Sequence, residues 1–164
     1  MEYRLFQYGT DDIYIKDVIE GLTHKGHLSE LSEAWFHQRF EQNPLGKAIL
    51  AGAFDNARLA AYALVERVTF NIDSPLVDGA CVSGMYFRQE YRGKVVLSDL
   101  LILAEEEARR QGIGVLFALN MPVLALDASR YGWICGTTKI RYRMKPVSVI
   151  KSIFKCNTPQ NLDH

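Results

Sequence analysis

The sequence predicts a single α+β domain built around a mostly antiparallel β-sheet. Three stretches between residues 47 and 87 have the apolar, β-branched and aromatic composition of strands, with turn residues between them. An amphipathic helix is predicted over residues 95–111, and a short apolar run follows at residues 113–119. A chain of 164 residues with 48% hydrophobic content can bury one sizeable core. We therefore expect one domain over residues 1–164, with residues 157–164 as a loose tail.

The N-terminal part is predicted to hold one strand and two helices. Residues 2–7 alternate weakly and are rich in Tyr, Leu and Phe, which favours a strand. The polar triplet at residues 10–12 supplies helix-capping side chains ahead of the apolar positions within residues 13–19. After a loop, Ser29 is the predicted N-cap of a second helix, which ends at residues 43–46.

Three strands are predicted next. Residues 47–54 and 58–70 flank a tight turn at residues 55–56, which indicates a β-hairpin. Residues 71–75 form a second turn. Residues 76–87 are the third strand, and it leads directly into a basic turn.

The helix predicted over residues 95–111 has the clearest periodicity in the chain. Gly112 is a suitable C-cap residue for it. The apolar run at residues 113–119 is nearly uninterrupted, as expected of a strand buried on both faces. The helix's buried stripe is predicted to consist of Leu97, Leu100, Leu101, Ala104 and Ala108.

The rest of the chain is predicted to add a helix and a strand. A short helix runs to about residue 131, and a strand with one basic face follows at residues 133–144. Residues 147–154 are apolar enough to dock on the domain, as strand or helix.

Charge and hydropathy exclude several classes of partner. The chain has 19 basic and 19 acidic residues, so nothing in its net charge argues for a nucleic-acid partner. No apolar run approaches the roughly 20 residues of a membrane span, so no membrane partner is expected. Residues 1–4 lack the apolar core of a signal peptide.

The cysteines and histidines do not predict a metal centre. Cys81, Cys135 and Cys156 are widely spaced, which favours reduced thiols in a cytoplasmic protein. His24 and His27 form a His-x-x-His pair without a carboxylate or cysteine at ligand spacing. We therefore expect no bound metal and a cytoplasmic location.

The basic turn after the third strand has the features of an anion site. It reads Tyr91-Arg92-Gly93-Lys94 and opens the amphipathic helix. The first N–H groups of a helix have no partner inside it, and the helix dipole places partial positive charge there. Arg92 and Lys94 add full charges, and Gly93 leaves room for a close approach. Phosphate or pyrophosphate is the simplest ligand for such a turn.

This order of elements, together with the basic turn, resembles the GCN5-related N-acetyltransferase (GNAT) superfamily over nearly the whole chain. Arg92 matches the first residue of that family's Gln/Arg-x-x-Gly-x-Gly/Ala signature, and Ser98 and Leu101 fall where the family often has Ser and Leu. The resemblance implies a mixed, mostly antiparallel twisted sheet with a parallel, splayed strand pair, flanked by about four helices. The stretch at residues 35–46 also resembles a subgroup associated with polysaccharide or amino-sugar biosynthesis.

The same resemblance implies acetyl-CoA as the acyl donor. Backbone amides of the basic turn would bind its pyrophosphate, and the preceding strand would hydrogen-bond its pantetheine arm like an added strand. Asn120, just past the next predicted strand, would contact the cofactor near the point where the two parallel strands splay apart. The implied cofactor-binding residues are Tyr86, Phe87, Arg92, Gly93, Lys94, Val95, Val96, Leu97, Ser98 and Asn120.

Two positions depart from the family's pattern. Val95 stands where the central Gly is usual, and Leu97 stands where Gly or Ala is usual. Because a β-branched side chain restricts the backbone and occupies space, Val95 is expected to crowd the pyrophosphate. The backbone amides remain available whatever the side chain.

Acetyl transfer to an amine needs a held thioester, donors for the oxyanion, a route for the amine's proton and an acid for the thiolate. The resemblance implies direct attack on the thioester, so no cysteine is assigned as a nucleophile. Glu66 is the candidate base, because desolvation in an apolar strand makes a carboxylate a better proton acceptor. The alternative is an outward-facing Glu66 paired with Arg67 or a neighbouring strand.

Ser83 and Tyr131 complete the catalytic candidates. Ser83 could relay a proton to Glu66 through water, provided that the strand register turns it toward the cleft. The family's usual acid, a Tyr, would fall at Ala128, and Tyr131 is the nearby substitute. The alternative for Tyr131 is a packing residue with its hydroxyl in water.

Three hypotheses follow from these observations. The first is an acetyl-CoA-dependent N-acetyltransferase acting on the amine of a small molecule, with an amino sugar as the suggested acceptor. The second is a GNAT-fold protein without turnover, which binds acyl-CoA or acts as a regulatory or interaction subunit. The third is an unrelated nucleotide binder, but the chain lacks both common glycine-rich phosphate motifs. The oligomeric state stays open, with a homodimer as one option.

Overall fold

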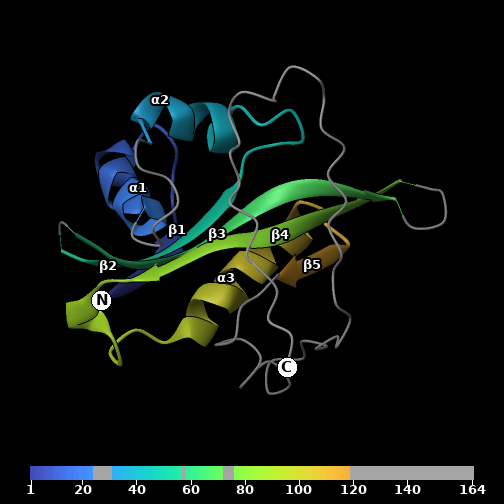
Figure 1. Ribbon diagram of the computed structural model, residues 1–164. Helices are drawn as coiled ribbons and strands as arrows, with labels where there is room; N and C mark the ends of the chain where they lie inside the picture. The colour runs from blue at the N-terminus through green and yellow to red at the C-terminus, as the bar shows by residue number, and fades with distance from the viewer. Residues whose placement is uncertain (24–30, 57, 72–75, 119–164) are drawn as a thin grey trace, which may run out of the picture.

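The computed structural model describes residues 1–23, 31–56, 58–71 and 76–118, and these form a five-stranded sheet with helices on both faces (Figure 1). The strands follow one another across the sheet in chain order, the first four antiparallel and the last pair parallel. This confirms the predicted mixed, mostly antiparallel sheet. The strands are β1 (Glu2–Leu5), β2 (Ile49–Asp55), β3 (Arg58–Asn71), β4 (Leu76–Phe87) and β5 (Val115–Ala118).

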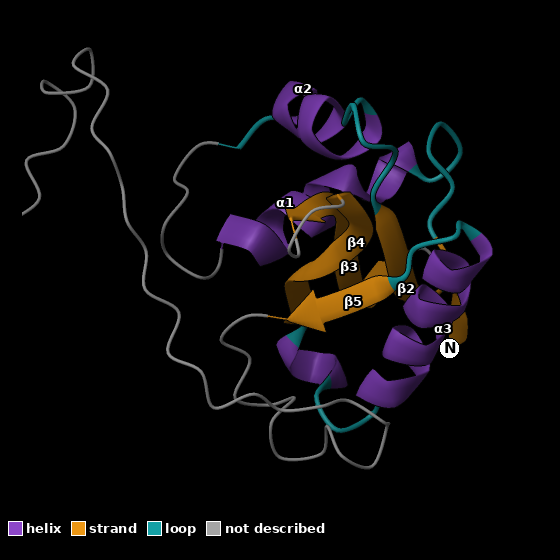
Figure 2. Cartoon of the chain, turned by 90° about the vertical axis from the view of Figure 1, so that its right-hand side faces the viewer, coloured by secondary structure: helices purple, strands orange, loops and turns teal. Residues whose placement is uncertain are grey.

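The helices lie on opposite faces of the sheet (Figures 1 and 2). The short 3-10 turn η1 (Asp12–Tyr14) leads into α1 (Ile15–Thr23), and α2 (Glu33–Phe36) continues as the π-helical turn η2 (His37–Glu41). These cover one face. The other face is covered by α3 (Leu97–Arg110), which follows the 3-10 turn η3 (Gln89–Tyr91).

Two predicted boundaries differ from the structure. The N-cap of α2 is Ser32, whose Oγ accepts a hydrogen bond of 3.1 Å from the Trp35 N–H, so Ser29 was the wrong serine. Both serines have capping chemistry, and only the course of the chain selects between them. The run after α3 was expected to be buried on both faces. In the structure Val115 is exposed and the rest of β5 is half-buried, because β5 is an edge of the described sheet.

Alanines in the middle of the sheet form the floor on which α3 lies. Large side chains on β1 and β4 flank small ones on β2 and β3, and all of them belong to one hydrophobic cluster with α3. The small floor lets the buried stripe of α3 approach the backbone closely, which confirms that predicted stripe. The paired rows are Tyr3–Ala53–Ala61–Phe87 and Leu5–Ala51–Ala63–Met85.

The α1 and α2 face has an aromatic core. Phe36 and Phe40 pack edge-to-face with ring centroids 5.1 Å apart, and both are fully buried. The hydroxyl of buried Tyr62 donates to the Val18 carbonyl at 2.9 Å, which ties β3 to α1. Burial raises the pKa of Tyr62.

Several sequence predictions fall outside the described part of the chain. These are the predicted helix and strand beyond residue 118, the tail, and the His24 and His27 pair. Within the described residues, no group of three His, Cys, Asp or Glu side chains could hold a metal ion. No helix in this part of the chain is both long and apolar enough to cross a membrane.

Candidate functional site

A bulge in β4 marks the place where its pairing with β5 stops. The parallel ladder runs from Gly79 opposite Val115 to Val82 opposite Ala118. On the other side, β3 pairs Leu64 with Gly84 and Val65 with Val82, so Ser83 is the extra residue of the bulge. Ser83 is exposed. The register thus leaves the backbone of Ser83 outside both ladders of the described sheet.

Beyond the bulge, β4 pairs with β3 alone among the described strands. The Arg88 N–H donates to the Ala60 carbonyl at 3.0 Å, so the backbone of Arg88 faces β3. Because backbone direction alternates along a strand, Tyr86 also turns its backbone toward β3, while Met85 and Phe87 turn theirs to the other edge. Tyr86 and Phe87 were expected to offer backbone groups to the pantetheine arm. In the structure the backbone groups of Tyr86 face β3, and those of Met85 and Phe87 face the other edge.

The turn after β4 is held by its own hydrogen bonds. The Lys94 and Val95 N–H groups donate to the Tyr91 carbonyl at 3.0 and 3.3 Å, and Gly93 takes a positive φ of 77°. A positive φ favours glycine, which explains this residue in the turn. Arg92 is exposed, and Lys94 lies with its Nζ 5.8 Å from the centroid of the Tyr91 ring. Neither cation forms an ion pair with another described residue.

Among the described residues, no side chain caps the N-terminus of α3. Its N-cap residue is Val96, which is extended and offers no oxygen. The Val96 N–H donates instead to the Tyr3 hydroxyl at 3.0 Å. In the described part of the chain, the N–H groups of Leu97 and Ser98 have no acceptor. Two free amides and the positive end of a 14-residue helix therefore follow the basic turn.

Val95 does not crowd this turn. Its side chain is only 9% exposed and belongs to the cluster beneath α3, where Leu100 and Leu101 also pack. Leu97 is half-buried against the same cluster. The branched side chain expected to enter the anion site thus points into the core, because the turn rotates the backbone between Gly93 and the helix.

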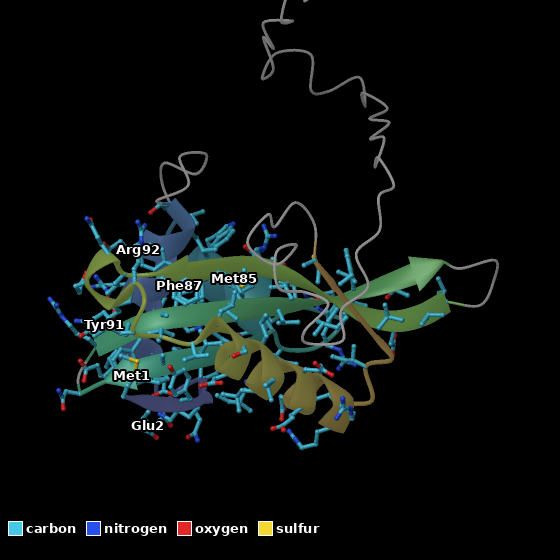
Figure 3. The ribbon with its side chains drawn as sticks, turned by 90° about the horizontal axis from the view of Figure 1, so that it is seen from below. Met1, Glu2, Met85, Phe87, Tyr91 and Arg92 are labelled. Carbon is cyan, nitrogen blue, oxygen red and sulfur yellow. The ribbon has the colours of Figure 1, made fainter. Side chains whose placement is uncertain are left out.

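The start of the chain lies beside the turn. The hydrogen bond between Tyr3 and Val96 brings β1 to the N-terminus of α3. In the sheet, β2 and β3 separate β1 from β4, the strand that leads into this helix. Met1 and Glu2 lie at the same end of the molecule as the turn in Figure 3. The residues labelled in that view are Met1, Glu2, Met85, Phe87, Tyr91 and Arg92.

Glu66 lies on the face of the sheet covered by α1 and α2. Arg39 of η2 donates to both of its carboxylate oxygens, from Nε and Nη2, at 3.1 Å each. The Glu66 side chain is 13% exposed, whereas that of Arg39 is 49% exposed. The outward pair with Arg67 that the sequence left open does not occur, because β3 alternation turns Glu66 toward η2.

Cys81 pairs with Glu66 across the β3–β4 ladder, two positions from Ser83 along β4. Burial and the nearby Glu66 charge both raise the pKa of the Cys81 thiol. A protonated thiol is a poor nucleophile. The surroundings of Cys81 therefore do not favour a nucleophilic thiolate at this position.

Arg88 ties the turn to α1. Its Nη2 lies 2.6 Å from Asp17 Oδ1 and 3.2 Å from Glu20 Oε2, and its Nε donates to the Leu59 carbonyl at 3.1 Å. The side chain of Arg88 is 14% exposed. The residue at the end of β4 is therefore fixed between α1 and β3.

The sequence candidates within the described residues follow one part of the sheet, but Glu66 is on the α1 and α2 face and Phe87 is on the α3 face. Glu66, Ser83, Phe87 and the basic turn lie along β3, β4 and the start of α3. Asn120 and Tyr131 lie outside the described residues. Sequence reasoning did not single out Met85, Tyr3, Arg39 or Arg88, which pair with or hydrogen-bond to residues of these elements. Met85 and Tyr3 have no motif signal. Arg39 lies inside the predicted second helix, and Arg88 directly follows the predicted third strand, so only their charge could have drawn notice.

Comparison with protein-family models and with curated proteins found no match. Solved structures do match over most of the chain. A glucosamine-6-phosphate N-acetyltransferase from Arabidopsis thaliana superposes with a TM-score of 0.65 at 11% identity, covering 88% of this chain and 100% of that chain. A predicted acetyltransferase from Clostridium acetobutylicum, solved with acetyl-CoA, gives 0.65 at 15% identity, covering 87% and 95%.

A GNAT family acetyltransferase from Staphylococcus aureus gives a TM-score of 0.61 at 14% identity, covering 87% of this chain and 98% of that chain. At such identities a likeness speaks for the fold, and the fold alone does not assign an activity. The chain has the GNAT fold, as the sequence resemblance implied.

Proposed function

We propose that this GNAT-fold protein is an acetyl-CoA-dependent N-acetyltransferase, which moves an acetyl group to the amine of a small molecule by direct attack on the thioester. The observation that carries the proposal is the succession of three features along one segment. The bulge at Ser83 is followed by the edge at Met85 and Phe87 and then by the basic turn and the start of α3, and within the described residues this edge is unpaired and this helix start has no side-chain cap. A thioester, an amide-containing arm and a pyrophosphate follow one another in the same way along acetyl-CoA.

The donor would bind mainly through backbone groups. Met85 and Phe87 offer a strand edge to the amides of the pantetheine arm, as in β-strand addition. The free N–H groups of Leu97 and Ser98 suit the pyrophosphate, with Arg92 supplying a full charge. Gly93, Lys94, Val95 and Val96 shape the turn through their backbone. Acetyl-CoA in the similar structure from Clostridium acetobutylicum supports this choice of donor.

The acyl group would lie at the bulge. A backbone N–H released from both ladders near Ser83 can donate to the oxyanion that forms when the amine attacks. The Ser83 hydroxyl, exposed at the same place, can carry the amine's proton toward Glu66. Arg39 holds the Glu66 carboxylate in place through two hydrogen bonds, which defines the position of the proposed base. Tyr131 remains our proposed acid for the departing thiolate.

The acceptor would reach the bulge from the α1 and α2 face. An amine is a cation before it reacts, and the Glu66 carboxylate on this face attracts it. We propose an amino sugar, in keeping with the substrate named for the similar Arabidopsis thaliana enzyme. We further propose that the chain works as one domain in the cytoplasm, where acetyl-CoA is available and Cys81 stays reduced.

A second candidate is a GNAT-fold protein that binds acyl-CoA without turnover. The observation that favours it is that most backbone N–H groups of the turn already donate hydrogen bonds. The Arg92, Lys94 and Val95 N–H groups bind carbonyls within the turn, and the Val96 N–H binds Tyr3. Fewer amides are then left for the pyrophosphate.

Calorimetric titration of the purified protein with acetyl-CoA tests the donor site. Arg92→Ala should weaken binding about 10-fold or more, because a charge-assisted contact to phosphate is lost. Asp99→Asn should tighten binding, since Asp99 is an exposed acid in the first turn of the same helix. Arg109→Ala, in the last turn of α3, is the matched control and should leave binding unchanged.

The two candidates are then separated by turnover. Release of CoA thiol in the presence of glucosamine 6-phosphate or other amino sugars supports the enzyme. Tight acetyl-CoA binding without transfer to any amine in a broad panel supports the second candidate. No binding at millimolar acetyl-CoA would overturn both.

A further inference from the structure

We infer that Tyr3 of β1 is a cofactor-binding residue, whose hydroxyl donates a hydrogen bond to a phosphoryl oxygen at the start of α3. The inference rests on the proposed acetyl-CoA site and adds to it a residue from the opposite edge of the sheet. Tyr3 lies 93 positions before Val96 in the sequence, outside every motif of the basic turn.

The sheet places Tyr3 at this site. Tyr3 pairs with Ala53, which pairs with Ala61, which pairs with Phe87, so Tyr3 and Phe87 end one row on the α3 face. The two alanines between them are fully buried beneath α3, and their small side chains let the helix lie close to the sheet. The Tyr3 ring packs against the core beneath α3, and its hydroxyl reaches the N-cap residue of the helix.

The Tyr3 hydroxyl can donate a hydrogen bond. A phenolic oxygen donates one hydrogen bond and accepts others. Here it accepts from the Val96 N–H at 3.0 Å, and none of the described residues accepts its own proton. A hydroxyl that accepts a hydrogen bond becomes a stronger donor, because the bonds polarise one another. The group is thus a prepared donor next to the positive end of a helix.

Three donors converge at this helix start. They are the Tyr3 hydroxyl and the N–H groups of Leu97 and Ser98, neither of which has an acceptor among the described residues. A valine at the N-cap provides no side-chain oxygen, so Tyr3 also performs the capping role. Because the Val96 N–H is already bound, the hydroxyl extends its donor function outward, toward the place where a phosphate would lie.

The test compares two ligands on one variant. Tyr3→Phe removes the hydroxyl and keeps the ring. Calorimetry should show CoA binding weakened by about 10- to 100-fold, the range for a hydrogen bond to a charged group. Pantetheine, which lacks phosphate, should bind wild type and Tyr3→Phe equally. Tyr8→Phe is the matched control, since it removes a hydroxyl that donates to the Ala48 carbonyl far along the chain from the turn.

A conservative replacement keeps the test decisive. Tyr3→4-aminophenylalanine retains a donor at the same reach and should restore most of the CoA affinity that Tyr3→Phe loses. Thermal melts of both variants show whether losing the acceptor for the Val96 N–H destabilises the fold, so that a loss of CoA affinity can be told from a loss of stability.

Several results would overturn the inference. Unchanged or tighter CoA binding by Tyr3→Phe would mean that the hydroxyl only caps the helix or competes with the ligand. Equal losses for CoA and pantetheine would mean a general structural effect. If wild type itself binds no CoA, the proposed donor site fails and the role of Tyr3 falls with it. If wild type binds and Tyr3→Phe does not differ, only the role of Tyr3 fails.

Discussion

Arg39 holds Glu66 through two hydrogen bonds, from Nε to Oε2 and from Nη2 to Oε1, each 3.1 Å long. The guanidinium also lies 5.3 Å from the centroid of the Trp35 ring and 5.5 Å from that of Phe40. This geometry fixes the carboxylate of Glu66 on the α1 and α2 face, two ladder positions from the bulge. It connects the aromatic layer over the sheet with the proposed chemistry at β4.

Glu66→Gln tests the proposed base. The replacement keeps the size of the side chain and an oxygen for Arg39 but can no longer take a proton. We expect kcat to fall about 10²- to 10⁴-fold, with acetyl-CoA affinity unchanged. Glu41→Gln is the control, because Glu41 pairs with Lys47 and His37 on the same face. A Glu66→Gln variant with wild-type kcat would reduce the pair with Arg39 to a structural role.

Gly21→Ala is expected to destabilise the fold, although alanine favours helices. A Cβ at Gly21 would lie 2.6 Å from both the Tyr62 hydroxyl and Tyr86 Cγ. Because both rings are held in the layer beneath α1, we expect a loss of about 1–3 kcal/mol in the free energy of unfolding. Gly114→Ala is the control, since its nearest neighbour would be 3.9 Å away. Urea unfolding measures both, and a stabilised Gly21→Ala would show that α1 can shift freely.

Arg88→Met should loosen the connection between α1 and the end of β4. The variant keeps an unbranched side chain but removes the charged partner of Asp17 at 2.6 Å, so that Asp17 keeps the longer bond from the Leu59 N–H at 3.4 Å. We expect a loss of about 1.5–3 kcal/mol in the free energy of unfolding, the range for hydrogen bonds to charged groups. Arg58→Met, which breaks an exposed pair with Glu90 at 3.7 Å, should cost about 0–1 kcal/mol. Equal effects of the two replacements would contradict the account of Arg88.

The lowered pKa of Asp11 makes the free energy of unfolding depend on pH. Burial raises the pKa of Asp11, but hydrogen bonds from Arg4 and from the Gln7 N–H outweigh it and hold the pKa below its usual range. A lowered folded-state pKa means that the stabilisation is present above the unfolded value of about 3.9 and is lost as the pH falls through the folded value.

Wild type and Asp11→Asn should therefore differ most in urea midpoint near neutral pH, and the difference should shrink in acid. Glu2→Gln is the control, because the Glu2 side chain is 69% exposed. A difference between wild type and Asp11→Asn that is the same at neutral and acid pH would show that Asp11 acts through packing alone.

The sequence was sufficient for the features that depend on local pattern. The long strands β3 and β4, the tight turn between β2 and β3, and the stripe of α3 all follow from composition and periodicity. The start of α2 was missed because Ser29 and Ser32 offer equal capping chemistry. The bulge at Ser83 gives no local signal, since a bulge depends on how two strands align.

Contacts between distant residues could not be predicted in the same way. Tyr3 and Val96 are 93 residues apart, and Arg39 and Glu66 are 27 apart. The direction of Val95 depends on the turn, where Gly93 takes a positive φ and rotates the chain so that the valine enters the core. A family pattern compares residue types, and it carries no information about this rotation.

The central claim is that acetyl-CoA lies along the edge of β4 at Met85 and Phe87, which no described strand covers, and ends at the start of α3. Amide chemical shifts followed by nuclear magnetic resonance during an acetyl-CoA titration test this placement most directly. Met85, Phe87, Leu97 and Ser98 should shift together with one dissociation constant, and strands β1 and β2 away from Tyr3 should change little. Saturable shifts confined to other parts of the protein, with these four amides unchanged, would contradict the account.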